Sequence, residues 1–168
     1  MSVERHKAAG DQAVRCFVMT VSDTRTKDTD KSGRLMIDKL SESGHQMVAY
    51  RIVPDEAEGI LEALKEGIED PAIDTILLNG GTGIAERDVT IEAVQSIFDK
   101  EIPGFGEIFR MLSYSEDIGS AAILSRAAAG VSGKTAVFST PGSTGAVKLA
   151  MDRLILPELI HVVNELKK

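Results

Sequence analysis

One stretch near the middle of the sequence constrains the fold more than any other. An apolar run of strand length, Thr75–Asn79, stops at residues 80–83, where three of four positions are glycine. After Asp88 the apolar spacing becomes that of a helix. A buried strand that opens through a glycine-rich turn into a helix lets backbone N–H groups approach an anion closely. We therefore predict that residues 80–88 form the floor of a binding site.

Strands and amphipathic helices alternate along the rest of the chain. Besides Thr75–Asn79, strands are predicted at 14–21, 47–53 and 134–140, and 127–131 is read as a short strand or turn. Helices are predicted around 35–43, 60–70, 90–99, 107–114, 119–126 and 147–154, and at 158–166 after a kink or break near Pro157. Segments that alternate in this way predict an α/β protein with a mostly parallel sheet.

Length and composition predict one domain and narrow the choice of partners. Residues 14–168 are enough for a core without disulfides, and 1–13 are predicted to be a flexible tail. A net charge of −7 opposes binding to nucleic acid or an anionic membrane, and 4% aromatic residues leave little for base stacking. No signal core and no apolar run of about 18 residues is present, so we expect a cytoplasmic protein without membrane contact.

Three predicted strands end in small or hydroxyl-bearing residues. In an open parallel sheet these carboxyl ends lie together, and ligands bind outside them. The turn at 80–83 lacks the pattern of a Walker loop and of a dinucleotide fingerprint. A purely structural turn, or for Ser143 a simple helix cap, is the alternative. The candidate substrate-binding residues are Ser22, Gly80, Gly81, Thr82, Gly83, Pro141, Gly142, Ser143 and Thr144.

Two carboxylates follow the predicted strands, and we place both in the site. Asp55 comes just after the second strand and Asp88 ends the glycine turn. Mg²⁺ is commonly bound by one or two carboxylates together with substrate phosphates, so both are candidate catalytic and metal-binding residues. The alternative for each is an N-cap of the following helix. In the polar segment 22–31, predicted to be a surface loop, Arg25 or Lys27 could close over an anion.

An ordered set of motifs resembles the molybdopterin-binding family of molybdenum cofactor biosynthesis, on the protein B branch beside the molybdopterin adenylyltransferases. The resemblance runs from about Arg15 to the C-terminal helix. The motifs are Thr20-Val21-Ser22-Asp23, Gly80-Gly81-Thr82-Gly83 with Asp88, Gly104-Phe105-Gly106-Glu107 with Phe109-Arg110, Ser125-Arg126-Ala127, and Pro141-Gly142-Ser143.

The resemblance implies a fold, a ligand and a reaction. The fold would be a three-layer α/β/α sandwich, and the ligand would be molybdopterin, a pterin dithiolene with a terminal phosphate. Adenylyltransferases of the family transfer AMP from Mg-ATP to that phosphate, and their two essential acidic residues match Asp55 and Asp88. Members assemble as trimers or hexamers and act with other molybdenum cofactor biosynthesis proteins.

The match to the adenylyltransferases is incomplete. The segments 110–113 and 141–144 look more like the protein B branch, in which adenylyl transfer is not a uniform property. One alternative is therefore a non-catalytic molybdopterin carrier or scaffold, and another is a generic phosphosugar or nucleotide enzyme. The sequence also leaves open whether Glu107 and Arg110 face ligand or a neighbouring subunit.

Overall fold

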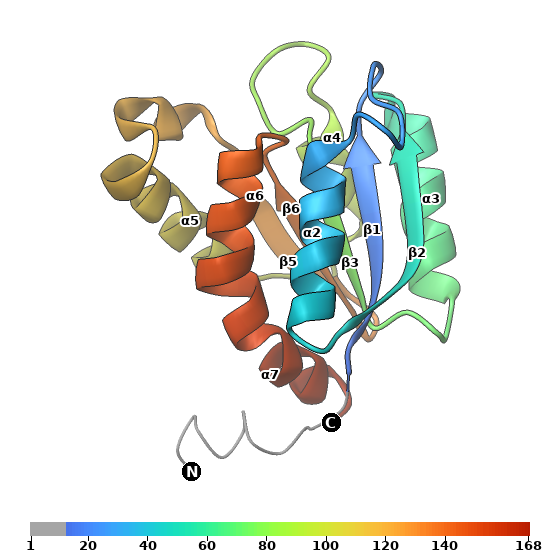
Figure 1. Ribbon diagram of the computed structural model, residues 1–168. Coiled ribbons are helices and arrows are strands. Elements are labelled where there is room, and N and C mark those ends of the chain that lie inside the picture. The colour runs from blue at the N-terminus through green and yellow to red at the C-terminus, as the bar shows by residue number, and fades with distance from the viewer. Residues whose placement is uncertain (1–12) are drawn as a thin grey trace.

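A six-stranded sheet forms the middle layer of the computed structural model, which describes residues 13–168 (Figure 1). The strands lie in the order β2-β1-β3-β6-β5-β4. Their bounds are β1 (Arg15–Val21), β2 (Gln46–Val53), β3 (Thr75–Asn79), β4 (Lys100–Glu101), β5 (Ala128–Ser132) and β6 (Thr135–Thr140). The first four strands in this order pair in parallel, and β5 and β4 add antiparallel pairs at one edge. The predicted mostly parallel sheet is confirmed. The predicted tail lies outside the described residues, apart from Ala13.

Helices cover both faces of the sheet and make a three-layer α/β/α sandwich, as the resemblance implies. They are α2 (Lys31–Glu42), α3 (Ala57–Glu69), α4 (Thr90–Ile97), α5 (Pro103–Glu116), the 3₁₀ helix η1 (Gly119–Leu124), α6 (Thr144–Ala150), the π helix η2 (Met151–Ile155) and α7 (Leu156–Leu166). One apolar core lies between the sheet and α2, α5, α6 and α7, and a second lies between the sheet and α3 and α4. Successive strand residues point to opposite faces, so Val18 enters the first core and Met19 the second. None of the described helices has the length and apolar character of a membrane span.

The C-terminal helix accommodates Pro157 without a break. The segments α6, η2 and α7 follow one another directly from Thr144 to Leu166. Proline has no N–H for the helical ladder, and the turn before it is π-helical. There the Leu156 N–H donates to the Met151 carbonyl, five residues earlier. The wider turn keeps the chain helical where the sequence left a kink or break open.

The structure also differs from the prediction at α5 and β4. Helix α5 begins at Pro103 instead of 107, because proline is tolerated at a first helical position. Strand β4 has only two residues, Lys100 and Glu101, and was not predicted. It exists because it pairs with Val131 and Gly130 of β5. Such a short strand leaves no periodic pattern in the sequence.

A buried carboxylate, Asp30, joins two strands to the start of α2. Its Oδ1 accepts a hydrogen bond from the Gly33 N–H at 3.0 Å and so caps the helix. Its Oδ2 accepts one from Thr20 Oγ1 at 2.6 Å and another from the Tyr50 hydroxyl. The segment 22–31 is predicted to be a surface loop, but one of its residues, Asp30, is in the interior and only 1% exposed.

Removal of Asp30 is expected to weaken the whole fold. Asp30→Ala leaves the Thr20 and Tyr50 hydroxyls and the first turn of α2 without their acceptor. A buried polar group left without its hydrogen-bond partner costs about 1–3 kcal/mol. Urea unfolding followed by circular dichroism measures the change. Asp28→Ala, at an exposed position of the same segment, should alter the free energy of unfolding by about 0.5 kcal/mol or less. Equal stabilities for the two variants would contradict this role of Asp30.

Candidate functional site

The strands β1, β3 and β6 are neighbours, and their carboxyl ends lie side by side at the same end of the sheet (Figure 1). The register pairs Thr20 with Asn79 and Asn79 with Thr140. Asn79 and Thr140 are the last residues of their strands, and Thr20 is one residue from the end of β1. The loops that follow therefore begin next to one another. Strand order also reverses here, since β1 lies between β2 and β3, and such reversals form ligand crevices in open α/β sheets.

The glycines after β3 are required by the path of the backbone. Gly80 and Gly81 have φ values of 104° and 69°, in the left-handed region that favours glycine. A Cβ at Gly80 would overlap the Val21 carbonyl, and one at Gly81 would overlap Thr90 Oγ1. The Gly80 N–H donates to the Thr140 carbonyl at 3.0 Å, which attaches the turn to β6. The turn is thus built for close approach of backbone to its neighbours.

Asp88 folds back over this turn. The N-cap of α4 is Val89, which makes no side-chain cap bond, so the N-cap alternative for Asp88 is wrong. Instead, Asp88 Oδ2 accepts a hydrogen bond from the Ala85 N–H at 3.0 Å. A Cβ at Gly83 would lie 2.7 Å from the same oxygen. The absence of a side chain at Gly83 lets the carboxylate lie against the turn.

Asp55 is a buried carboxylate on the other side of the glycine turn. Glu56 is the N-cap of α3, so the N-cap alternative is wrong here as well. The Asp55 side chain is 9% exposed, and its Oδ2 lies 3.7 Å from Arg87 Nη2. Burial raises the pKa of Asp55, as do the charges of Asp23 and Asp88, while Arg87 lowers it. A cation would stabilise the charged form of this side chain.

The oxygen atoms around Gly81 suit a hard divalent cation. An ideal Cβ at Gly81 would lie 3.5 Å from Asp55 Oδ1 and against Thr90 Oγ1. The Thr90 hydroxyl is buried and has no hydrogen-bond partner among the described residues. Within residues 13–168, no three His, Cys, Asp or Glu side chains gather as a complete metal site. The donors therefore fit Mg²⁺, which takes one or two carboxylates and completes its shell with phosphates and water.

A cavity of about 330 Å³ opens beside the turn. Seven predicted site residues line it, namely Gly81, Thr82, Gly83, Asp88, Pro141, Gly142 and Ser143. The other predicted residues do not line it: Gly80 lies against Gly142, Thr144 begins α6, Asp55 follows β2 and the Ser22 hydroxyl accepts bonds from the Thr24 and Arg25 N–H groups. Ser143 also caps α6 through the Ala146 N–H, so its predicted role as a cap is confirmed. The volume is sufficient for a small-molecule ligand.

The opposite wall of this cavity was not predicted. It comes from α5, η1 and the residues on either side of η1, and it combines apolar side chains with a few polar ones, namely Phe109, Ser113, Asp117, Ile118, Ala121, Leu124 and Ser125. These residues carry no spacing that separates them from ordinary helix residues. Phe109 and Ser125 belong to motifs of the resemblance, but only the packing of α5 beside η1 and α6 brings the set to one cavity.

Arg25 joins the loops around the site. Its Nη2 donates to the Gly142 carbonyl at 2.9 Å and its Nη1 to Asn79 Oδ1 at 3.4 Å. The same guanidinium lies 3.7 Å from Asp30 Oδ1. The sequence suggested an arginine that closes over an anion, whereas these contacts hold the loop after β6 against β1 and β3.

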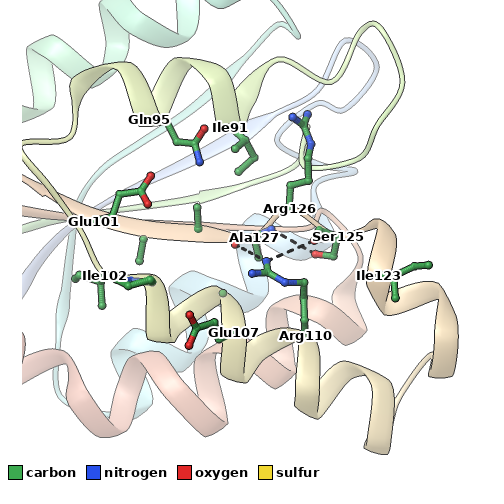
Figure 2. Close-up of a pocket in the computed structure, with 14 residues that line it drawn as sticks. Ile91, Gln95, Glu101, Ile102, Glu107, Arg110, Ile123, Ser125, Arg126 and Ala127 are labelled. Carbon is green, nitrogen blue, oxygen red and sulfur yellow. Dashed lines mark hydrogen bonds between the residues drawn. The ribbon is translucent and has the colours of Figure 1, made fainter.

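A second cavity, of about 370 Å³, lies on the far side of α5 (Figure 2). Arg110 lies at its border and donates to the Ala127 carbonyl at 3.0 Å and to that of Ser125 at 3.5 Å. Glu107 and Glu101 also line this cavity. Arg110 is therefore hydrogen-bonded within its own chain.

The fold and site define an α/β sandwich with a glycine turn, two flanking carboxylates and an adjoining cavity at the carboxyl edge. A family model described as a probable molybdopterin binding domain matches residues 17–161. The chain belongs to this molybdopterin-binding family of molybdenum cofactor biosynthesis. The resemblance seen in the motifs is confirmed.

Relatives and solved structures agree over nearly the whole chain. Molybdenum cofactor biosynthesis protein B of Bacillus subtilis is 64% identical over 168 residues, covering 100% of this chain and 99% of that protein. A crystal structure of molybdenum cofactor biosynthesis protein B has a TM-score of 0.92 at 56% identity and covers 94% of this chain and 98% of that one. The tungsten cofactor synthesizing protein MoaB from Pyrococcus furiosus has a TM-score of 0.84 at 40% identity, covering 95% and 100%.

Replacement of Asp55 by a neutral isostere is expected to stabilise the protein without ligands. The pKa of Asp55 lies above its value in an unfolded chain, so the free energy of unfolding falls as pH rises through that window. At pH 7 the charged carboxylate therefore costs stability, and Asp55→Asn should unfold at a higher urea concentration than the wild type. The difference should shrink near pH 4, about the unfolded value. Asp28→Asn is the exposed control, and a less stable Asp55→Asn at pH 7 would contradict the prediction.

Proposed function

We propose that the chain binds molybdopterin and transfers AMP from Mg-ATP to its terminal phosphate. One observation carries the proposal: Asp55 and Asp88 flank a single glycine turn, and that turn lines a cavity of ligand size. Two buried or half-buried carboxylates repel an anionic substrate unless a cation lies between them. Membership of the molybdopterin-binding family supports the choice of acceptor.

The reaction needs little covalent chemistry from the protein. An oxygen of the molybdopterin phosphate forms a bond to the α-phosphorus of ATP, and the bond to the β-phosphate breaks to release pyrophosphate. The attacking phosphate is already anionic at neutral pH, so no strong base is required. Positioning and charge neutralisation then supply most of the rate.

The side chains and backbone of this site have distinct roles in the proposal. The Gly80 N–H is bonded to Thr140, so the backbone N–H groups of residues 81–83, together with the Ser143 loop, hold phosphate oxygens. Asp55 and Asp88 would hold Mg²⁺, which when bound neutralises charge on the transferring phosphates. The apolar wall from α5 and η1 excludes water from one side of the ligand.

An assay with purified protein, molybdopterin and Mg-ATP tests the proposal. Adenylylated molybdopterin and pyrophosphate are the expected products. Asp88→Asn removes one of the two charges and should lower kcat by about 10²–10³-fold, as loss of one electrostatic group commonly does. Asp28→Asn should turn over like the wild type. Wild-type and Asp88→Asn rates that match would refute the catalytic assignment, and molybdopterin binding without ATP consumption would favour the carrier alternative.

We further propose that the chain assembles with copies of itself as a trimer or hexamer. Helix α5 exposes Ile108, Met111 and Tyr114 at 44, 58 and 62%. Their spacing of three places them on one helix face, and Ile118 continues the apolar surface. Contiguous apolar surface of this kind is typical of an interface between chains.

Sedimentation velocity measures this assembly. The wild type should have a mass that is three or six times the 18.0 kDa of one chain. Met111→Asp places a charge on the exposed face of α5 and should shift the protein to smaller species, because burial of an unpaired carboxylate is costly. Met47→Asp, on the exposed edge strand β2, is the matched control. A monomeric wild type, or an unchanged mass for Met111→Asp, would contradict the proposal.

A further inference from the structure

One arginine, Arg126, is bonded to both ends of the loop that carries Asp88. Its backbone N–H donates to the Thr82 carbonyl at 3.1 Å. Its Nε donates to the Gly83 carbonyl at 2.8 Å, and its Nη2 donates to the Asp88 carbonyl at 3.0 Å. The guanidinium is planar and rigid, so these bonds fix the distance between the start and the end of the loop.

Glu92 of α4 holds this guanidinium in place. Both of its carboxylate oxygens accept hydrogen bonds from Arg126, from Nη1 and, at 3.3 Å, from Nη2. The bond to Arg126 lowers the pKa of Glu92, so the carboxylate stays charged at neutral pH. A paired carboxylate gives the arginine a defined orientation toward the loop.

A second arginine holds the backbone on either side of Arg126. Arg110 Nη1 donates to the carbonyls of Ser125 and Ala127, its two chain neighbours. Gly106 leaves room for this, since a Cβ there would lie 2.9 Å from Arg110 Nη1. In Figure 2 Arg126 extends away from α5, while Arg110 reaches toward the backbone beside it. Arg110 therefore links α5 to the backbone beside Arg126, and Arg126 links that backbone to the glycine turn.

We propose that Arg126 is a positioning residue for Asp88, and that Arg110 supports it from α5. The inference rests on the proposed adenylyl transfer. Within residues 13–168 the Asp88 carboxylate accepts one hydrogen bond, from the Ala85 N–H, and it stands on a loop that begins with two left-handed glycines. Two hydrogen bonds between Ala85 and Asp88 close the end of this loop, but among the described residues only Arg126 is bonded to both Gly83 and Asp88. Displacement of a catalytic group by about 1 Å can cost about 10²-fold in rate.

The test compares Arg126→Ala and Arg126→Lys with the wild type. Lysine offers a single compact ammonium that cannot reach the Gly83 and Asp88 carbonyls and Glu92 in one plane. We expect Arg126→Ala to lower kcat by about 10²-fold and to raise the Mg²⁺ concentration for half-maximal rate, with KM for molybdopterin changed by about twofold or less. Arg126→Lys should fall between the two. Arg51→Ala breaks an exposed ion pair with Glu66, which lines neither cavity, and is the matched control.

Hydrogen–deuterium exchange of a peptide spanning residues 80–89 gives a readout that does not depend on turnover. Faster exchange there in Arg126→Ala, with the rest of the sheet protected as in the wild type, supports the positioning role. A wild type that transfers AMP together with an Arg126→Ala kcat equal to it would overturn the inference. A wild type that transfers no AMP refutes the proposed function instead. In that case unchanged exchange in the variant overturns the inference separately.

Discussion

The arrangement of the site depends first on one buried carboxylate, that of Asp30. It accepts hydrogen bonds from Thr20 at the end of β1 and from Tyr50 of β2, and it caps α2 through the Gly33 N–H. Arg25 lies beside it and reaches the Gly142 carbonyl. A charge in the interior is stable only when it is fully paired, so these partners are held together at one place. Two strands, a helix and the loop after β6 thus share one anchor at the edge where the cavity opens.

The glycine turn after β3 is braced from two sides by groups of different kinds. At its start, Gly81 lies against the buried Thr90 hydroxyl. Further along, Arg126 is bonded to the carbonyls of Gly83 and Asp88. Asp55 is buried there with a raised pKa, so in the protein without ligands its charge opposes folding. A residue of this kind is typical of functional sites, where stability is given up for a group that a ligand later satisfies.

Much of the fold could be predicted because its signals are local. The apolar runs of the four parallel strands, and the helices between them, follow from periodicity within a few residues of one another. The exceptions have nonlocal causes. The two residues of β4 form a strand only because β5 lies beside them, and Asp30 is buried only because Thr20 and Tyr50 supply its partners. The π turn before Pro157 continues a helix that the proline by itself would interrupt.

The sequence by itself determined the strand that leads into residues 80–83. It also placed Asp55 just after a strand and Asp88 at the end of the glycine turn, because strands and turns follow from residues that are close together in the chain. The motifs also identified the family. The tertiary structure alone decided that α5 and η1 form the opposite wall of the cavity and that Arg126 is bonded to the loop of Asp88. Residues 82 and 126 are far apart in the chain, and a hydrogen bond between them depends on how whole layers pack, which no local pattern records.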